Sequence, residues 1–240
     1  MQHLNQLEGI RVIIPAFNEA LSITQVIEAI PAFVAEVVVV NNASTDATIQ
    51  VAKKAGATVL TENRMGYGYA CLKGIDYIKE NYPQTKIIVF LDGDFSDFPE
   101  YLTSLVKPIL ENDFDFVIGA RVKKLREKSS MTFPQIFGNW LATKLMKVMY
   151  KANYTDLGPF RAIKLNCLLA LNMQDKTYGW TVEMQLKALH HQLNYTEIEV
   201  PYRNRIGVSK VSGTLKGAFM AGVKILAWIF KYGVQKQKKQ

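Results

Sequence analysis

Short runs of β-branched residues alternate with helical patterns through the first half of this 240-residue chain. Five runs predict strands: IRVIIPAFNE, which we expect to stop at Pro15, then EVVVVNN, ATVL, KIIVFLDGD and FDFVIGAR. Amphipathic stretches at about residues 19–30, 45–55 and 68–81 lie between the first four, and Ser44, Thr45 and Asp46 are capping candidates for the second. This alternation favours an α/β fold of Rossmann type, with a mostly parallel, twisted central sheet flanked by helices on both faces.

The alternation breaks after Arg121. The segment VKKLREKSSMT is polar, basic and aperiodic, so we predict a mobile loop that closes over a ligand. Beyond it, FGNWLATKLMKVMY and GWTVEMQLKALHH predict helices, YTDLGPFRAIK a turn with a short strand, and NYTEIEVPYRNR a late strand. The apolar stretch TLKGAFMAGVKILAWIFKYGV, interrupted by lysines, predicts a helix near the C-terminus.

Composition indicates an ordinary folded protein. The hydrophobic share of 49% is enough to bury one sizeable core. Cys71 and Cys167 are far apart and have no metal-ligand spacing, so we expect no disulfide framework and a reducing cytoplasm. The N-terminal residues show no secretory signal pattern.

The net charge of +8 predicts an anionic partner, such as nucleic acid, phospholipid head groups or a phosphorylated small molecule. No zinc finger, helix-turn-helix spacing or platform of aromatic and basic residues is visible, so we do not expect nucleic acid. Gly66 and Gly68 match part of a dinucleotide fingerprint, but its third glycine and its acidic ribose partner are missing. His190 and His191 are adjacent on a predicted helix and point in different directions, so we expect structural roles for both.

Four polar segments follow predicted strands and should meet at one edge of the sheet, where ligands bind in such folds. They are residues 15–19, 41–46, 92–97 and 119–121. Asp92 and Asp94 flank Gly93, and two oxygen donors at this spacing suit a hard divalent cation that also binds a diphosphate. The alternative is an acidic turn, and for Asp97 we favour the role of a cap on a helix that begins near Pro99.

Five motifs in this order resemble the nucleotide-sugar domain of family 2 glycosyltransferases: VIIPAFNEA, VVVVNNASTDAT, NRMGYGYACLKGI, LDGDFSDFPE and VIGAR. Further on, YTDLGPFRAI, YGWTVEMQLKA and RNRIGVSKVSGT resemble the branch that contains dolichyl-phosphate mannose synthase and bacterial polyprenyl-phosphate sugar transferases. The likeness extends from about Ile10 to about Thr214. It implies a GT-A-like fold and a glycosyltransferase activity, because the ordered set of motifs is specific although no single motif is.

The resemblance also implies roles for individual residues. Pro15, Phe17 and Glu19 match the segment that lines the nucleotide base and ribose, and Asp92 and Asp94 match the motif that binds Mg²⁺ or Mn²⁺ and the diphosphate. Arg121 matches an arginine that faces the transferred sugar and the acceptor phosphate. The family also has a late loop that closes on the diphosphates, and Arg205, Ser209 and Lys210 match that loop. Asn41, Gly93 and Ser96 complete the expected nucleotide-sugar site. Phe17 could instead belong to the core, and Arg205 or Lys210 could simply solvate a turn.

Three positions depart from the family pattern. Asn41 and Asn42 replace two aspartates at the end of the second strand, so the base preference is expected to differ. Ser96 stands where a glutamine is common and has a shorter reach. Gln135 and Ile136 stand where relatives often place an arginine beside the acceptor phosphate. The donor is therefore better specified than the acceptor.

The resemblance implies an inverting transfer of a hexose from a nucleotide diphosphate sugar to a polyprenyl phosphate. A phosphate monoester is largely ionised at neutral pH and needs cations, whereas a hydroxyl acceptor needs a base. Glu183 and Asp156 are possible bases, although Glu183 could simply complement the N-terminus of a predicted helix. Transfer to a soluble hydroxyl acceptor, and a non-catalytic nucleotide-sugar binding module, are the alternatives.

The predicted organisation is a glycosyltransferase domain at 1–213, with a donor half at about 1–121 and an acceptor half at about 122–213, followed by an amphipathic helix and basic tail at 214–240. The tail helix is marginal for crossing a bilayer. We expect it to lie at the inner face of the membrane with Trp228, Phe230 and Tyr232 at head-group depth, or to pack on the domain or across a homodimer.

Overall fold

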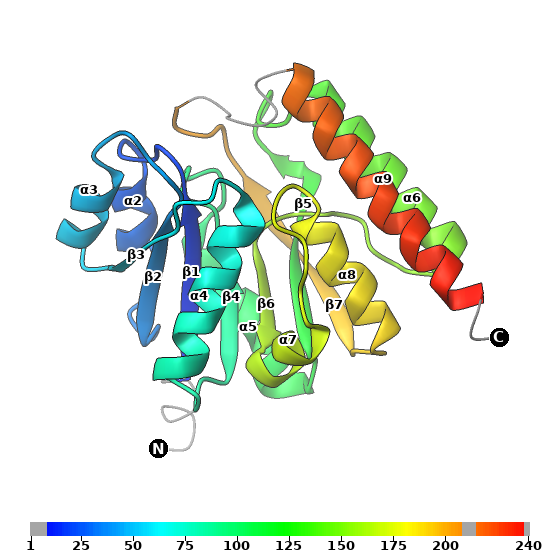
Figure 1. Cartoon of the computed structure of the whole chain (residues 1–240), viewed down its shortest axis with the longest axis horizontal. Coiled ribbons are helices and arrows are strands. Elements are labelled where there is room, and N and C mark those ends of the chain that lie inside the picture. Colours follow the sequence, from blue (N-terminus) through cyan, green and yellow to red (C-terminus); the bar gives the residue numbers. More distant parts are fainter. Residues whose placement is uncertain (1–8, 208–214, 238–240) are drawn as a thin grey trace.

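A computed structural model describes residues 9–207 and 215–237 of the chain (Figure 1). Its elements follow one another in this order: β1 (Ile10–Ala16), α2 (Ile23–Glu28), β2 (Glu36–Asn41), α3 (Thr48–Lys54), β3 (Thr58–Thr61), α4 (Tyr67–Asn81), β4 (Ile87–Phe90), the 3-10 helix η1 (Pro99–Tyr101), α5 (Leu102–Asn112), β5 (Phe116–Arg126), α6 (Phe133–Tyr150), β6 (Arg161–Lys164), α7 (Leu165–Leu171), α8 (Trp180–His190), β7 (Tyr195–Tyr202) and α9 (Leu215–Gln237).

Within the described residues, the strands form one seven-stranded sheet in the order β3-β2-β1-β4-β6-β5-β7. The first four strands in this order pair in parallel, and β5 pairs in parallel with β7. Of these seven strands, β6 alone runs antiparallel to its neighbours, β4 and β5. The predicted α/β fold with a mostly parallel sheet is confirmed. Because β1, β2 and β4 point the same way, their carboxyl ends meet at one edge of the sheet.

Apolar cores lie on both faces of the sheet. On one face, α4, α6, α7, α8 and α9 pack against strand residues that include Ile13, Val40 and Phe90. On the other face, α2, α3 and α5 pack against the alternate positions, such as Ile14 and Val39. Successive side chains of a strand point to opposite faces, so continuous β-branched runs are needed to fill both cores.

Two predicted boundaries are wrong for identifiable reasons. β1 does not stop at Pro15, because β4 pairs with β1 only as far as Ile13, and the missing N–H of Pro15 therefore lies beyond that neighbour. The basic segment after Arg121 continues β5 to Arg126, which pairs with Tyr202 of β7 after a register shift. It shows no apolar alternation because Lys123, Lys124 and Leu125 are exposed. The short helix α7 was not predicted.

Two helix starts show how local chemistry sets the ends of elements. The N-cap position of α3 is Ala47, and the Oδ1 atom of the preceding Asp46 accepts the backbone N–H of Thr48 at 3.0 Å, so Asp46 shapes the turn that leads into α3 without being its N-cap. At the start of α6, Thr132 and Gln135 form a capping box, followed by a proline in the first turn. This fixes the entry of α6, the helix that runs beside α9 in Figure 1.

The C-terminal helix α9 packs against α6 and α8. Trp228 and Ile229 are buried in the core, whereas Met220, Val223 and Phe230 are exposed. The prediction that Trp228 lies at head-group depth is therefore wrong, because its ring faces the protein interior. Among the described residues, no helix is both long enough and apolar enough to cross a bilayer.

Candidate active site

A cavity of about 460 Å³ opens at the carboxyl ends of β1 and β4. Part of its lining comes from residues that end or follow strands of the sheet: Pro15, Ala16, Phe17, Glu19, Asn42, Asp92, Gly93, Asp94, Arg121, Tyr202 and Arg205. We call this part the strand side. The rest, which we call the helical side, comes from helices and loops: Met65, Gly66, Tyr67, Gln135, Pro159, Thr177, Tyr178, Trp180, Thr181 and Ala221. Another cavity, of about 490 Å³, lies at the opposite end of the sheet near Ile87, and none of its lining residues carries a carboxylate.

The paired acids lie just beyond the end of β4. The hydroxyl of Tyr67 donates a hydrogen bond to Oδ1 of Asp92 at 3.1 Å. The peptide between the acids is fixed by Ser22, whose hydroxyl donates to the Gly93 carbonyl at 2.7 Å. Burial and the negative charge of Asp94 raise the pKa of Asp92 above its ordinary value. Two like charges are thus held close together, and a cation between them would relieve the repulsion.

Arg205 already supplies one positive charge to this pair. Its Nη2 atom forms an ion pair with Oδ2 of Asp94 and lies 4.0 Å from Oε1 of Glu19. The segment that carries it is tied to the acidic turn, because the N–H of Ile206 donates to the Asp94 carbonyl at 2.9 Å. A divalent cation that binds Asp94 through Oδ2 would compete with this arginine for the negative charge of the carboxylate.

Two carboxylates do not enclose a metal ion by themselves. In residues 9–207 and 215–237, no group of three or more His, Cys, Asp and Glu side chains could hold one. Mg²⁺, however, is usually bound by one or two carboxylates while waters and substrate phosphates complete the shell. Asp92 and Asp94 fit that kind of site, in which the substrate brings the remaining oxygens.

Asp97 is not a helix cap, contrary to the sequence-based prediction. The 3-10 helix that begins at Pro99 has Phe98 at its N-cap position and no capping side chain. The Asp97 carboxylate is buried and has no hydrogen-bond partner. Burial and the charge of Asp92 raise its pKa well above the ordinary value. The turn after Asp94 folds the side chain inward, where the sequence pattern alone would have placed it at a helix end.

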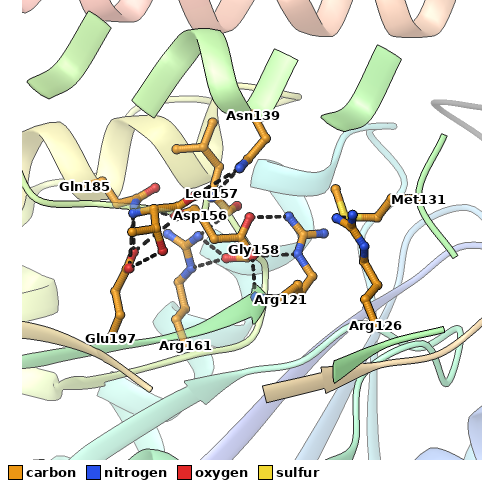
Figure 2. A network of polar contacts seen from close by, with 11 residues as sticks. Arg121, Arg126, Met131, Asn139, Asp156, Leu157, Gly158, Arg161, Gln185 and Glu197 are labelled. Carbon is orange, nitrogen blue, oxygen red and sulfur yellow. Dashed lines mark hydrogen bonds and ion pairs between the residues drawn. The ribbon is translucent and has the colours of Figure 1, made fainter. Parts of the chain in front are cut away.

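A buried arginine–carboxylate network joins Arg121 of β5 to Asp156 in the loop before β6 (Figure 2). Nε and Nη2 of Arg121 donate to the two carboxylate oxygens of Asp156, each at 2.7 Å, and the backbone N–H of Arg121 donates to Oδ2 at 2.9 Å. Although burial alone would raise it, the charge and hydrogen bonds of Arg121 hold the pKa of Asp156 below its ordinary value. Both oxygens of Asp156 therefore hold Arg121 at the cavity, and Asp156 does not act as a general base.

Arg161 stabilises the turn that presents Asp156. Its guanidinium is buried and donates to the carbonyls of Leu157 and Gly158 (Figure 2), and also to the carbonyl of Thr181. Burial lowers the pKa of Arg161 to about 10. Three carbonyl acceptors on one buried cation hold the loop before β6 against the start of α8.

Glu183 does not line the cavity. Its side chain is fully buried, and its two oxygens accept the backbone N–H groups of Gln174 and Asp175, each at 2.7 Å. Lys187 forms an ion pair with it at 2.7 Å, one turn along α8. The structure thus gives Glu183 the role of holding the loop between α7 and α8, and a role as catalytic base has no geometric support.

A family model described as Glycosyl transferase family 2 matches residues 11–167, a span that contains the paired acids, Arg121 and Asp156. The chain belongs to this family. The expected family resemblance is confirmed, and the chain is a glycosyltransferase rather than a binding module without activity.

A relative supports the family, and a solved structure shows the same fold. An uncharacterized glycosyltransferase of Mycobacterium tuberculosis is 32% identical over 217 residues, which cover 89% of this chain and 94% of the relative. Glycosyltransferase AglJ of Haloferax volcanii is 26% identical over 82% of this chain and 64% of its own length. Glucosyl-3-phosphoglycerate synthase from Mycobacterium tuberculosis, solved with Mn²⁺, uridine diphosphate and glucosyl-3-phosphoglycerate, aligns with a TM-score of 0.75 at 19% identity, over 95% of this chain and 83% of that one. The likeness confirms the GT-A-like fold.

The glycosyltransferase brings most of the predicted site residues together. Pro15, Phe17, Glu19, Asp92, Gly93, Asp94, Arg121 and Arg205 all line the cavity. Ser96 does not, since it is buried beneath Asp94 and donates its N–H to that carboxylate at 2.9 Å. Ser209 and Lys210 lie outside the described residues.

The two asparagines at the end of β2 separate into different roles. Asn41 does not line the cavity, and its Oδ1 atom accepts the N–H of Ser44 at 3.3 Å. Asn42 lines it and also organises the next loop, because its amide donates to the Arg64 carbonyl at 2.7 Å and accepts the N–H of Gly66 at 2.8 Å. The site residue at this strand end is thus Asn42, one position further along.

The helical side of the cavity was largely missed from the sequence. Its residues carry few charges, and the motif YGWTVEMQLKA was the only signal that pointed to Tyr178, Trp180 and Thr181. The glycines at 66 and 68 now have a structural explanation. A Cβ atom on Gly66 would clash with the Lys176 carbonyl oxygen, and one on Gly68 would clash with that of Asp175. These glycines allow α4 to approach the loop before α8, and they do not form a nucleotide fingerprint.

Proposed function

We propose that this glycosyltransferase transfers a hexose from a nucleotide diphosphate sugar to a polyprenyl phosphate, with Mg²⁺ or Mn²⁺ and with inversion at the anomeric carbon. The observation that carries the proposal is the cavity in which paired acids and arginines meet, and in which the carboxylates among the described lining residues, Glu19, Asp92 and Asp94, all follow the strands that we assign to the donor. Residues up to about 121 would bind the donor, and residues from about 122 to 213 would form most of the acceptor side.

Donor binding is supported by the strand ends of β1 and β4. Phe17 and Glu19 line the cavity and would face the nucleoside, and Asp92 and Asp94 would hold the metal against the diphosphate. When bound, the metal would act as a Lewis acid for the leaving diphosphate. Arg205 already lies on Asp94 and is therefore placed to pair with diphosphate oxygens once that carboxylate is occupied. The relative of known structure that we describe was solved with Mn²⁺ and uridine diphosphate, which supports this arrangement.

A phosphate acceptor is supported by how the acids of the site are used. Among the described residues that line the cavity, the carboxylates are Glu19, Asp92 and Asp94. These lie on the donor side, while Asp156 and Glu183 are bonded elsewhere. A phosphate monoester, with a second pKa of about 6, attacks without a base and is attracted by a cation such as Arg121. Attack from the face opposite the leaving group would invert the sugar.

A lipid acceptor is supported by the exposed face of α6. Phe133, Phe137 and Trp140 are 78%, 50% and 55% exposed, and along this helix the ring of Phe137 stacks on Phe133 and lies tilted against Trp140. We call these three residues the aromatic face of α6. Gln135, in the first turn of the same helix, lines the cavity. Aromatic side chains on an amphipathic helix are favourable at the head-group level of a membrane, so we propose peripheral contact at the cytoplasmic surface through α6 and α9.

A soluble phosphorylated acceptor is the second candidate. It is favoured by the synthase of known structure, which was solved with glucosyl-3-phosphoglycerate. A phosphoglycerate that keeps its phosphate would react through a hydroxyl, so this candidate needs a base as well as cations, whereas a polyprenyl phosphate needs cations and a lipid surface.

The test is an incubation of the protein with UDP-glucose or GDP-mannose, Mn²⁺, and either farnesyl phosphate or 3-phosphoglycerate, followed by analysis of products. We expect a metal-dependent sugar–lipid phosphate that is absent with Asp94→Asn. A product on phosphoglycerate alone would overturn the lipid acceptor, and retention of the anomeric configuration would overturn the single displacement.

A further inference from the structure

The loop between α7 and α8 connects the C-terminal helix to the cavity. Residues Thr177 and Tyr178 of this loop line the cavity, and so does Ala221 of α9. Between them lies Asp175, whose side chain is buried. We call residues 173–179 the 173–179 loop.

The two oxygens of Asp175 serve different partners. Oδ1 accepts the backbone N–H groups of Thr177 at 2.7 Å and Gly179 at 3.0 Å, and so shapes the loop itself. Oδ2 accepts the indole N–H of Trp228 at 2.6 Å and lies 3.3 Å from Nζ of Lys224, both of which belong to α9. One carboxylate therefore joins the loop to the helix.

This division explains why an acid is needed at position 175. An asparagine could satisfy both loop N–H groups through its single carbonyl oxygen, but its NH₂ group would then face two donors of α9. The carboxylate is thus required by the helix and not by the loop. A buried acceptor that receives an N–H and a nearby ammonium forms a strong, charge-assisted contact.

Other contacts hold the 173–179 loop in place, so that a shift of Asp175 would also move its neighbours Thr177 and Tyr178. Glu183 holds the N–H groups of Gln174 and Asp175, and the carbonyl of Lys176 accepts the N–H of Tyr69 at 3.2 Å. Besides these contacts with α4 and α8, α9 holds the loop through the bond from Trp228 to Asp175. Movement of α9 would therefore reach Thr177 and Tyr178 through Asp175.

We propose that Asp175 is a positioning residue that couples the docking of α9 to the shape of the acceptor side of the cavity. The proposal rests on the proposed function only in taking the wall with Thr177 and Tyr178 to face the acceptor. Asp175 acts through this wall and does not touch substrate. In this way α9, which we propose contacts the membrane surface, is linked to the site where a polyprenyl phosphate would bind.

The test uses two conservative variants of the full chain. Trp228→Phe keeps an aromatic ring and removes the N–H donor, and Asp175→Asn keeps the loop acceptor and removes the acceptor for α9. Each is expected to raise the KM for farnesyl phosphate about tenfold while the KM for the nucleotide sugar changes less than about twofold. Ala227→Gln, at an exposed position next to Trp228, is the matched control and should change neither constant.

The double variant distinguishes coupling from independent structural damage. In Asp175→Asn an NH₂ group opposes the indole N–H, and adding Trp228→Phe removes that conflict, so the double variant should be no worse than Asp175→Asn alone. Equal rises in both KM values, or additive losses in the double variant, would overturn the proposal.

Hydrogen exchange tests the coupling between α9 and the 173–179 loop whichever acceptor the enzyme uses. The amides of Thr177 and Gly179 should exchange at least about fivefold faster in Trp228→Phe than in the wild type, and at the wild-type rate in Ala227→Gln. This holds even if farnesyl phosphate is not a substrate, in which case only the proposed function fails. Unchanged exchange in a folded Trp228→Phe protein would overturn the coupling.

Discussion

The two sides of the cavity are built in different ways. The donor side consists of strand ends, where β1 and β4 deliver Glu19, Asp92 and Asp94 from short turns after buried β-branched runs. The acceptor side is assembled from α6, the 173–179 loop, the start of α8 and one residue of α9. A charged site on a sheet edge needs little beyond the sheet, whereas the weakly charged wall opposite depends on packing between distant segments. We therefore expect substitutions on the two sides to affect different measurements.

The largest expected effect tests the charged side. Asp94→Asn should lower kcat on the order of 10³-fold, because the metal loses an anionic ligand at the leaving diphosphate. Product analysis with Mn²⁺ gives the rate, and calorimetry of Mn²⁺ with uridine diphosphate gives the binding. Thr61→Ala, at an exposed position on β3, is the control. Wild-type turnover in the Asp94→Asn variant would remove the paired acids from the mechanism.

Arg205→Gln should separate the two roles of Arg205, which are to stabilise the leaving group and to pair with Asp94. Transfer should fall about 10²-fold, since a cation at the leaving group is lost. In the absence of nucleotide, Mn²⁺ should bind about tenfold more tightly, a change of about 1.4 kcal/mol, because Asp94 no longer pairs with the arginine. Calorimetry measures the second effect without any turnover. Weaker Mn²⁺ binding in this variant would contradict the competition for Asp94.

Glu183→Gln should act on the other side through stability. The amide can accept at one oxygen only, and Lys187 loses its buried partner, so the free energy of unfolding should fall by about 3 kcal/mol. Urea denaturation measures the loss, and kcat of the folded fraction should fall less than about fivefold. Glu111→Gln, which removes a carboxylate from an exposed ion pair, should change stability by less than about 0.5 kcal/mol. A near-total loss of turnover in a stably folded Glu183→Gln variant would restore the base mechanism.

The aromatic face of α6 should matter for membranes and not for chemistry. The double substitution Phe137→Ser and Trp140→Ser should weaken binding to vesicles with anionic lipid about tenfold or more, because two exposed aromatic rings no longer insert. Vesicle sedimentation measures this. Transfer to a short-chain acceptor in solution should stay within about twofold of the wild type. Unchanged sedimentation would leave the soluble acceptor as the better candidate.

The smallest effect is a pH dependence at the Arg121–Asp156 pair. The pKa of Asp156 is lowered in the folded protein, so the stabilisation from its charge is complete above the ordinary Asp value of about 3.9 and is lost as the pH falls through the folded value. The stability difference between the wild type and Asp156→Asn should therefore stay constant from about pH 7 to about pH 4 and shrink only at lower pH. Urea denaturation over a pH series checks this. Asp113→Asn, at a carboxylate that is 95% exposed, is the control.

Much of the fold could be predicted because it depends on local patterns. β-branched runs that fill both faces of a sheet, together with the amphipathic stretches between them, placed the first five strands and their helices. The predicted loop after Arg121 failed because that part of β5 is held by pairing with β7, which lies far along the chain. Hydrogen bonding to a distant strand leaves no periodic signal when the side chains on both faces are exposed.

The residues of the site also divide into those that the local sequence predicts and those that it does not. Asp92 and Asp94 could be located because carboxylates after a buried strand are costly without a partner. Asn41 and Asn42 could not be told apart, since the turn that follows β2 decides which amide faces the cavity. The roles expected for Asp97 and Glu183 differ from those found, because both side chains are buried and the neighbouring residues in the sequence do not reveal burial. Trp228 likewise faces inward because Asp175 lies there as its acceptor.

The sequence by itself determined the fold class, the family and the charged edge of the sheet, since each follows from the order of residues along single strands and turns. Only the tertiary structure decided which acids remain available, which arginines hold them and how α9 reaches the cavity. The physical reason is that charge neutralisation and hydrogen bonding in a buried site depend on distances between segments, and those distances exist only after the helices have packed on the sheet.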